Sequence, residues 1–431
     1  MSAGGAHFAN SSTVYVRQAD IAAQTFANRN GRFSAAERAV FRNLLTDNCG
    51  GTLESDSSLE IASAQFDNRS GQTAARQAVI TAETANAGGT LDADRLKLTG
   101  RSLDNSGGMI RTDEAAVLSL SDGLDNRSGL ISAKQDVSIQ TGTLQNGGGS
   151  LTAGRDLNLE SAGLRTDGTL AAGRDMAVSL KEDFTNTQTL EAGRNLTLHT
   201  QGRLNNAGSR LTGSTAATVE AAAVGNGQHT GGRKRPSERE SQAILSNLGL
   251  INSGGLTRVE AAEIENAGSG RIYGNHIALA AGRLNNYEEN ADGTTRAAVV
   301  TARERLDIGA TEIHNREGGL IASEGSLYIG GRLNGQNRAE GTAQRLTNGS
   351  AHRSKRGCRD CGGRFAESEQ PFQGGRISGR EEACRVLYAC RRSRAVFCCL
   401  WGIQYGKGSL KAVLKGVNDV GWIEKLVTRA I

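Results

Sequence analysis

Apolar residues recur at nearly constant intervals along the first three quarters of the chain. Each of these anchors precedes a cluster of Asn or turn-forming residues, and successive anchors are separated by 21, 20, 20, 20, 20 and 20 positions. The anchors are Leu103, Leu124, Leu144, Leu164, Phe184, Leu204 and Val224, with a looser continuation toward the N-terminus through Ala85, Phe66, Leu45 and Phe26. Such constant spacing predicts a repeat architecture in place of independent globular domains.

Each unit has the same internal order of apolar and turn residues, as the stretch 144–161 shows. Leu144 is followed by Asn146 and three glycines, and a second turn precedes Leu157 and Leu159. Apolar residues at every second position are typical of a strand with one buried face. Gly and Asn supply the left-handed backbone that tight corners require. No segment of the repeat has helical spacing over three turns, so each unit is predicted to consist of short strands joined by corners.

A single repeat unit has almost no core of its own, whereas stacked units bury a continuous apolar column. The strands of successive coils then lie parallel, about 4.8 Å apart. The sequence therefore predicts an all-β fold: a right-handed parallel β-helix, built as a solenoid of about 20-residue coils, with an unstructured C-terminal tail. The expected handedness follows the rule for parallel crossover connections.

Two sets of residues are expected to define this solenoid. One is an internal core column formed by Leu103, Leu124, Leu144, Leu164, Phe184 and Leu204. The other is a corner ladder, in which stacked side-chain amides bond to one another along the axis. The ladder residues are Asn105, Asn126, Asn146 and Asn206. The alternative is that these are independent turn asparagines.

Composition divides the chain near Ser350. Residues 1–350 carry 34 Lys and Arg against 38 Asp and Glu, whereas residues 351–431 carry 16 against 7. Six of the seven Cys and both Trp also follow Ser350. The basic character of the whole chain thus belongs to the segment 351–431, and it does not indicate that the repeat binds nucleic acid.

The chain after Ser350 departs from the repeat pattern. The string at 345–350 resembles the opening of another coil, but a Cys- and Arg-rich stretch follows it. We interpret this tail as out-of-frame or disordered, because its one short apolar stretch cannot offset the conformational entropy of ordering the whole segment. The alternatives are a zinc module that includes Cys358 and Cys361, a disulfide-bonded cap, and a nucleic-acid patch near Arg391.

The predicted organisation has five parts. The polar stretch that interrupts the repeat contains a basic run, which we interpret as a solvated loop in preference to a nuclear-import or phosphate-binding patch. The parts are 1–25, a partial coil; 26–224, regular repeats; 225–250, the polar insertion loop; 251–350, further repeats with loop insertions at 287–296 and 334–344; and 351–431, the atypical tail.

Enzymatic function is an alternative, because β-helices also form polysaccharide lyases and hydrolases, which need carboxylates converging on one groove. Acidic residues that recur at a corner in every coil are explained by coil geometry before chemistry. Those assigned to corners are Asp92, Asp94, Asp156, Asp175 and Asp307. The six His are scattered without metal-ligand or Ser-His-Asp spacing, and His199 and His276 are expected to face outward. The sequence indicates no enzyme and no catalytic, cofactor-binding or metal-binding residue.

Several units resemble the repeats of filamentous haemagglutinin-family proteins. The matching strings are LTAGRDLNL (151–159), LAAGRDMAV (170–178), LEAGRNLTL (190–198), LNNAGSRL (204–211) and IHNREGGLI (313–321). The resemblance covers about 26–350. It implies a large secreted exoprotein at the surface of a Gram-negative bacterium, exported through an outer-membrane two-partner transporter.

Members of this family act as adhesins in virulence, or as stalks that carry a toxin in contact-dependent growth inhibition. The resemblance thus implies a receptor or glycan partner on a host or neighbouring cell, and neither nucleic acid nor a membrane-spanning segment. No run of about 18 apolar residues is present, in agreement with this expectation. The signal peptide and toxin module of a full-length member are not recognisable, so we interpret the chain as a fragment.

Overall fold

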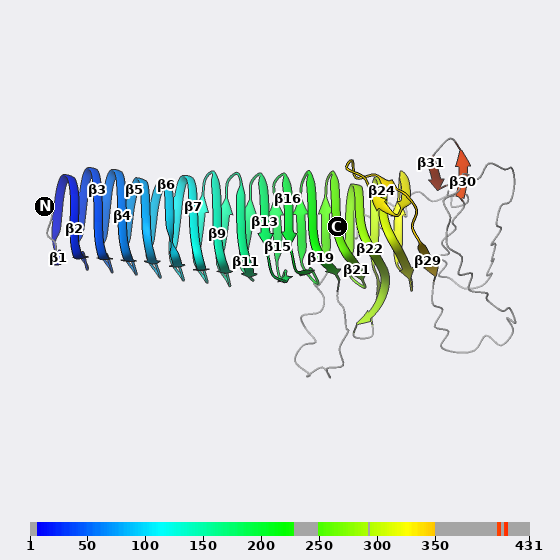
Figure 1. The fold of residues 1–431 in the computed structure, drawn as a ribbon, viewed down its shortest axis with the longest axis horizontal. Helices are drawn as coiled ribbons and strands as arrows, with labels where there is room; N and C mark the ends of the chain where they lie inside the picture. Colours follow the sequence, from blue (N-terminus) through cyan, green and yellow to red (C-terminus); the bar gives the residue numbers. More distant parts are fainter. Residues whose placement is uncertain (1–6, 228–248, 292–293, 350–402, 407–408, 413–431) are drawn as a thin grey trace.

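The computed structural model describes residues 7–227, 249–291, 294–349, 403–406 and 409–412. Its strands stack along one long axis as successive coils, from β1 (His7–Ala9) to β29 (Arg345–Gly349) (Figure 1). No helix occurs among these residues. The all-β parallel solenoid predicted from the repeat spacing is confirmed.

The N-terminal coils consist of long strands that bend around the corners. They are β2 (Thr13–Ala27), β3 (Arg32–Asp47), β4 (Thr52–Asp67), β5 (Gln72–Ala85), β6 (Thr90–Asp104) and β7 (Met109–Asp125). The middle coils are divided into shorter strands. These are β8 (Leu130–Ala133), β9 (Asp136–Gln145), β10 (Ser150–Ala153), β11 (Leu157–Arg165), β12 (Thr169–Ala172), β13 (Asp175–Leu180), β14 (Phe184–Thr185), β15 (Thr189–Ala192), β16 (Asn195–Thr200), β17 (Arg203–Asn205), β18 (Arg210–Gly213) and β19 (Ala216–Asn226).

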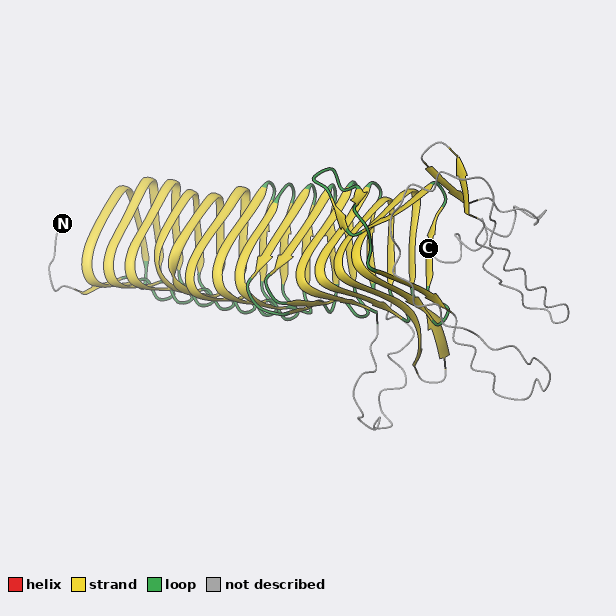
Figure 2. Cartoon of the chain, turned by 45° about the vertical axis from the view of Figure 1, so that its right-hand side comes forward, coloured by secondary structure: helices red, strands yellow, loops and turns green. Residues whose placement is uncertain are grey.

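The C-terminal coils return to longer strands and carry two antiparallel hairpins. The strands are β20 (Leu250–Ser253), β21 (Leu256–Ala267), β22 (Arg271–Ala291), β23 (Thr294–Ala297), β24 (Val299–Arg316), β25 (Leu320–Ser323), β26 (Ser326–Gly330), β27 (Arg332–Leu333) and β28 (Ala339–Glu340). In the turned view the yellow strands form the sides of the solenoid and green loops run along its lower edge (Figure 2).

Each middle coil has three sides, and each side pairs in parallel with the same side of the next coil. The first side contains β8, β10, β12, β15 and β18, paired in that order. The second side contains the starts of β9 and β11, then β13, β16 and the start of β19. The third side contains the ends of β9 and β11, then β14, β17 and the end of β19. Backbone groups are therefore satisfied mainly between coils.

Alternate side chains along each side point into a single core. On the second side Leu157 and Leu159 are at most 1% exposed, whereas Asn158 between them faces solvent. On the third side the predicted core column is fully internal: Leu103, Leu124, Leu144, Leu164, Phe184 and Leu204 are each at most 5% exposed. The first four are successive register partners, and Phe184 pairs with Leu204.

Two anchors predicted from the looser N-terminal spacing, Leu45 and Ala85, each differ by one residue from the position that the structure places in the column. The partner of Phe26 and Phe66 on the third side is Thr46, not Leu45, and the partner of Phe66 and Leu103 is Thr84, not Ala85. Thr46 is fully buried, and hydrogen bonds with Asn43 and Ser63 satisfy its hydroxyl. A polar residue whose hydrogen bonds are made can thus occupy the core column.

The insertions lie at corners, between two consecutive sides of a coil. Gly225 and Asn226, assigned to the insertion loop from sequence, are the end of β19, and Leu250 begins β20. The residues between them are outside the described part, except Gly227 and Gly249. The predicted insertion at 287–296 forms the antiparallel β22–β23 hairpin, and the one at 334–344 contains β28, paired with β27.

The segment 1–25, predicted to be a partial coil, contains β1 and the first residues of β2, which pairs with β3 from Thr13 onward. Of the tail at 351–431, the described residues form only an antiparallel pair, β30 (Ile403–Gly406) with β31 (Ser409–Ala412). The expectations of disorder, zinc or disulfides in the tail concern residues outside the described part.

Replacing Leu144 by Ala is expected to destabilise the solenoid by about 2–5 kcal/mol, because the truncation leaves a cavity in the core column. The matched control is Val117→Ala, since Val117 is 37% exposed and should cost no more than about 0.5 kcal/mol. Thermal unfolding followed by circular dichroism measures both. Equal losses would show that the third side does not carry the core.

Candidate functional site

Side-chain amides form a hydrogen-bonded ladder along the axis inside one corner of the solenoid. The Nδ2 of Asn105 donates to the Oδ1 of Asn126 at 2.7 Å, and the Nδ2 of Asn126 donates to the Oδ1 of Asn146 at 2.7 Å. Asn206 belongs to a second run of the ladder, where it accepts from Asn186 and donates to Asn226. The structure thus brings three of the four asparagines named from sequence into direct contact and places the fourth farther along the same corner.

The ladder is longer than the sequence-based set. Its first run also contains Asn10, Asn28, Asn48, Asn68 and Asn86, and its second run also contains Asn266, Asn286, Asn315 and Asn348. The signal that finds most of them is an Asn two residues after an inward-facing residue of the third side, with a Gly within the next three positions. Loose spacing of the apolar anchors hid this signal in the N-terminal coils.

Each ladder amide is satisfied although it is buried. Asn126 is fully buried, and its Nδ2 lies 3.3 Å from the carbonyl oxygens of both Gly129 in its own corner and Ser150 in the next coil. The next corner, after Asn146, uses two glycines: Gly148 has a φ of 62°, and a Cβ on Gly149 would lie 2.0 Å from the Asn126 carbonyl oxygen. The ladder therefore sets the register between coils.

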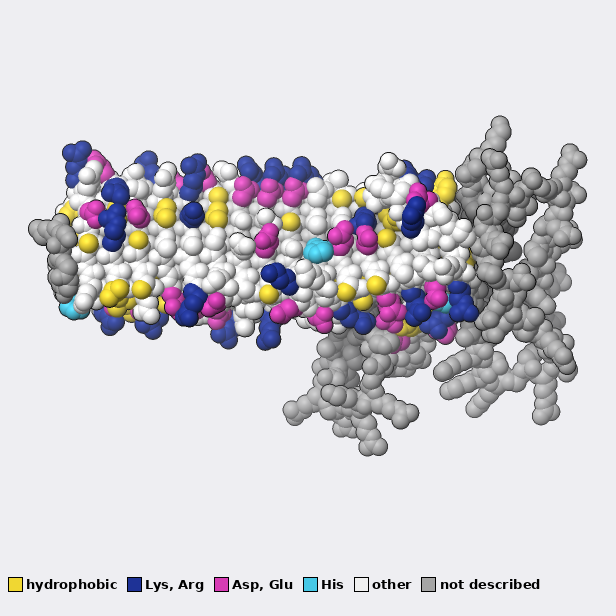
Figure 3. Space-filling view, in the orientation of Figure 1, with side chains coloured by type: hydrophobic (Ala, Val, Ile, Leu, Met, Phe, Trp, Pro, Cys, Tyr) yellow, Lys and Arg dark blue, Asp and Glu magenta, His cyan; other side chains and the backbone are white. Residues whose placement is uncertain are grey.

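The outer surface carries rows of ion pairs that link one coil to the next (Figure 3). Arg155 bonds to Asp136 of the preceding coil, and the same contact joins Arg174 to Asp156. Arg194 bonds in turn to Asp175, and these hydrogen bonds hold the pKa of Asp156 and Asp175 below the usual value. The recurring carboxylates thus have coil-to-coil partners.

The corner assignment of the acidic residues needs correction at two positions. Asp156 lies between β10 and β11, Asp175 begins β13, and Asp94 lies at an irregularity of β6. Asp92 and Asp307, however, lie within strands β6 and β24. The strand pairing continues through both positions, and this cannot be inferred from the Asp spacing alone.

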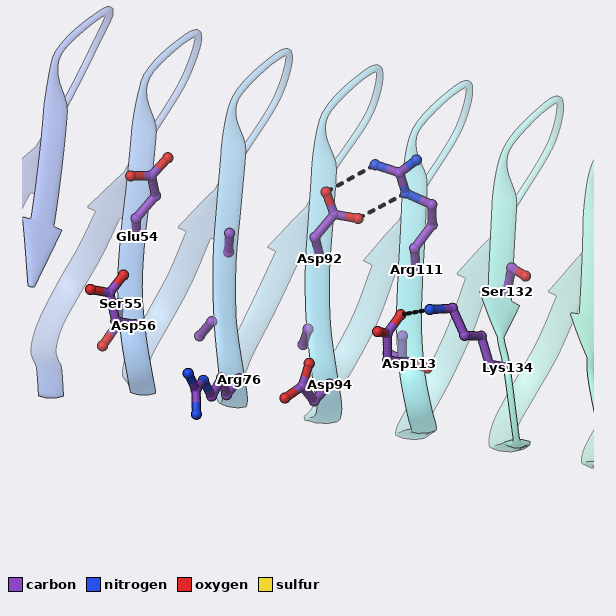
Figure 4. Close-up of a pocket in the computed structure, with 14 residues that line it drawn as sticks. Glu54, Ser55, Asp56, Arg76, Asp92, Asp94, Arg111, Asp113, Ser132 and Lys134 are labelled. Atoms are coloured by element: carbon purple, nitrogen blue, oxygen red, sulfur yellow. Dashed lines mark hydrogen bonds and ion pairs between the residues drawn. The ribbon is translucent and has the colours of Figure 1, made fainter. Parts of the chain in front are cut away.

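A charged groove of about 620 Å³ crosses the outer surface from β4 to the corner after β8 (Figure 4). Asp92 accepts two hydrogen bonds from Arg111, at 2.8 and 3.0 Å, and Asp113 pairs with Lys134 at 2.7 Å. Small side chains, including Ala74 at the position equivalent to Asp92, leave room between the charged rows.

Three further charges in this groove make no hydrogen bond or ion pair within the described residues. They are Asp56, Arg76 and Asp94, which occupy neighbouring coils. Both signs of charge are thus available to a ligand along one line of the solenoid. Among the described residues no group of His, Cys, Asp and Glu side chains is arranged to hold a metal ion, and no helix is long and apolar enough to cross a membrane.

A second polar cluster lies under the β27–β28 hairpin. Asp307 is fully buried and accepts hydrogen bonds from Arg305, from the backbone N–H of Ala339 at 2.9 Å, and from His276 at 2.9 Å. The Nη1 of Arg338 lies 3.8 Å from the same carboxylate. His276 does face outward from its coil, but its side chain is only 22% exposed because the hairpin covers it.

Burial and charge act in opposite directions on this cluster. Burial raises the pKa of Asp307, but Arg305, the Ala339 N–H and His276 together outweigh burial and hold it below the usual value. Burial lowers the pKa of His276, with small contributions from Arg338 and Arg305, although Asp307 acts in the other direction. The cluster therefore fastens the hairpin to the strands through an ionised Asp307 and a neutral His276.

Replacing Asn126 by Ala is expected to cost about 2–4 kcal/mol, because Asn105 loses its acceptor and Asn146 loses its donor in a buried corner. Asn158→Ala is the matched control, since Asn158 is exposed on a strand. Urea unfolding of both variants measures the difference. Equal midpoints would mean that the asparagines act independently as turn residues.

The hairpin contact is expected to weaken as the pH falls. The pKa of His276 is below its ordinary value of about 6.5, so opening of the hairpin takes up a proton and becomes easier as the pH falls below about 6.5. The contribution of Asp307 persists to about pH 4 and is lost at lower pH. Hydrogen exchange at Ala339, corrected for intrinsic rates, should report the first step.

His276→Gln is expected to remove the step between pH 7 and 5, and Asp307→Asn should raise exchange at Ala339 throughout the range above pH 4. Peptides covering 190–200 serve as an internal control, because they lie away from the hairpin. Unchanged pH dependence in His276→Gln would assign the step to another group.

Comparison with known proteins agrees with this geometry. The haemagglutinin repeat family matches residues 26–168, 160–208, 210–288 and 290–349. A protein named deoxyribonuclease CdiA, from Dickeya dadantii (strain 3937), is 28% identical over 294 residues, which cover 66% of this chain and 8% of that protein. A tRNA nuclease CdiA-2 from Burkholderia pseudomallei (strain 1026b) is 32% identical over 134 residues, 30% of this chain and 4% of that protein.

The chain therefore spans less than a tenth of the length of these relatives. No solved structure matches it significantly. The family matches extend over most of the chain and over the same coils that carry the amide ladder and the core column. The chain belongs to the haemagglutinin repeat family.

Proposed function

We propose that the solenoid is a non-enzymatic stalk of a large secreted bacterial exoprotein, which holds another domain away from the producing cell and presents it to a second cell. The observation that carries this proposal is the near-continuous register of the coils, from Asn10 to Asn348, along one axis. Each coil adds about 4.8 Å of length. A structure that extends in one dimension through repeated contacts is suited to spacing two objects apart.

The relatives favour presentation over direct adhesion. Both are named as nucleases, and in both the similar part is a small fraction of a much longer protein. A repeat of this kind in a long protein named for a nuclease is consistent with a stalk in contact-dependent growth inhibition. Export through an outer-membrane two-partner transporter is the route that we propose for the whole exoprotein.

Adhesion is the second candidate, and the charged groove is the observation that favours it. Asp56, Arg76 and Asp94 offer charges that have no partner among the described residues, and they line the groove on neighbouring coils (Figure 4). A receptor or glycan on a host or neighbouring cell would contact this line of charges. Glycan cleavage, the alternative of another class, would need the same carboxylates.

A deletion series tests the stalk. Removing residues 127–146 joins Asn126 to Gly147 and deletes one whole coil, so the ladder and the core column remain in register. We expect this variant to keep its β-sheet circular dichroism and to shorten the particle by about 4.8 Å in small-angle X-ray scattering. Removing only 127–136 should destroy the fold, because it shifts every strand against its neighbour.

A binding assay separates the stalk from the other candidates. The full chain on inert beads is expected to show no saturable retention on Gram-negative or epithelial cells and no turnover of polyuronates. Retention that Arg76→Ala abolishes, with Gln140→Ala as the control, would replace the proposal by adhesion. Turnover that Asp94→Asn abolishes would replace it by glycan cleavage.

A further inference from the structure

Among the coils that the structure describes, the parallel pairing between neighbours fails at one place on one side. On the third side the end of β11 pairs with the end of β9 behind it, and β14 pairs with β17 ahead of it. Among the described strands, no pairing joins the end of β11 to β14. On the first and second sides the same two coils remain paired, through β10–β12 and β11–β13. One side of the stack is therefore open where two are closed.

The amide ladder is interrupted at the same junction. Thr166 occupies the position that Asn holds in the coils before and after. Its hydroxyl accepts from the Nδ2 of Asn146 in the preceding corner at 3.3 Å, but among the described residues no hydrogen bond joins Thr166 to Asn186 in the next corner. In neighbouring corners the backbone N–H of the ladder residue donates to the next coil, as Asn146 does to Arg165 at 2.8 Å. Within the described part of the chain Thr166 makes no such bond. The junction thus lacks both the side-chain and the backbone contact of this corner.

Local sequence explains why the corner differs. Four positions separate Thr166 from its inward-facing Leu170, and four separate Asn186 from Leu190, whereas five separate Asn146 from Leu151. The shortened corners have no residue with positive φ at 167–169 or 187–189, unlike Gly148. The corner between the second and third sides is at the same time one residue longer, because Phe184 follows Leu180 by four positions whereas Leu164 follows the paired Ser161 by three. The extra residue displaces β14 from the end of β11.

A small bridge and the core hold the junction closed. The Nε2 of Gln188 donates to the Thr166 hydroxyl at 3.0 Å, and the Thr187 hydroxyl donates to the Thr166 carbonyl at 2.6 Å. Leu164 and Phe184 remain buried on either side of the gap. At the start of the opening the backbone N–H groups of Lys181 and Glu182 donate to the Ala162 carbonyl. Beyond that point the opening is sealed by packing and by two residues of one corner, in place of a strand ladder.

We propose that the junction between residues 163–169 and 183–189 is a built-in hinge of the stalk. The paired first and second sides form the pivot, and the third side opens when the Gln188 and Thr187 contacts break. Bending there costs fewer hydrogen bonds than at the neighbouring junctions, where the ladder and the strands must both separate. The hinge gives the stalk one preferred bending direction, whatever domain it carries.

Hydrogen exchange on the full chain tests the hinge. Peptides covering 163–169 and 182–189 are expected to exchange at least about tenfold faster than those covering 123–129 and 143–149, which belong to a closed junction. Electron micrographs should show bends concentrated at this position of the particle. Equal protection, or bends spread evenly along the rod, would overturn the proposal.

Two variants act on the junction in opposite directions. Thr166→Asn supplies the missing rung between Asn146 and Asn186 and should slow exchange at 182–189 severalfold. Gln188→Ala removes the bridge and should speed it, relative to Gln140→Ala, which changes an exposed Gln on a strand. If Thr166→Asn does not fold, the exchange rate at 182–189 in Gln188→Ala tests the hinge on its own. Exchange equal to that of Gln140→Ala would assign Gln188 no role and contradict the hinge.

Discussion

The register between coils is the constraint on which this structure depends. In a solenoid the backbone of one coil finds most of its hydrogen-bond partners only in the coils before and after it, so a shift of one residue exchanges the buried and exposed faces. The buried amide ladder suppresses such shifts, because each Asn must donate and accept at a fixed height along the axis. Small groups at Gly149 and its equivalents allow the close approach that this bonding needs.

The same constraint explains where the chain tolerates variation. The hairpin β22–β23 follows the ladder residue Asn286, and the large insertion begins directly after Asn226. At both points the ladder continues, from Asn226 to Asn266 and from Asn286 to Asn315. A corner can therefore be lengthened without loss of register, because the amide on the strand side of the corner keeps its partners.

A residue moved from one corner to another within a coil has a different consequence. The corner after Thr166 is one residue shorter and the corner before Phe184 is one residue longer, and at this junction the rung to Asn186 and the third-side pairing are lost. A stalk of identical closed junctions would be stiff throughout, whereas one open side provides a point of bending without a break in the core. The covered Asp307 cluster shows the opposite device, in which an insertion folds back and binds together strands of two coils.

Repeat spacing alone predicts the all-β repeat, the internal column through Leu144 and the corner position of Asn126, because a constant short period has only one way to bury its apolar residues. It misplaced Leu45 and Ala85, since a buried Thr with satisfied hydrogen bonds has no apolar signal. Only the tertiary structure showed that Gln188 reaches Thr166 and that the β27–β28 hairpin covers Asp307. These contacts join residues of different coils or of an insertion. Their geometry depends on how far whole strands are displaced, and the residue spacing within one repeat unit does not show that displacement.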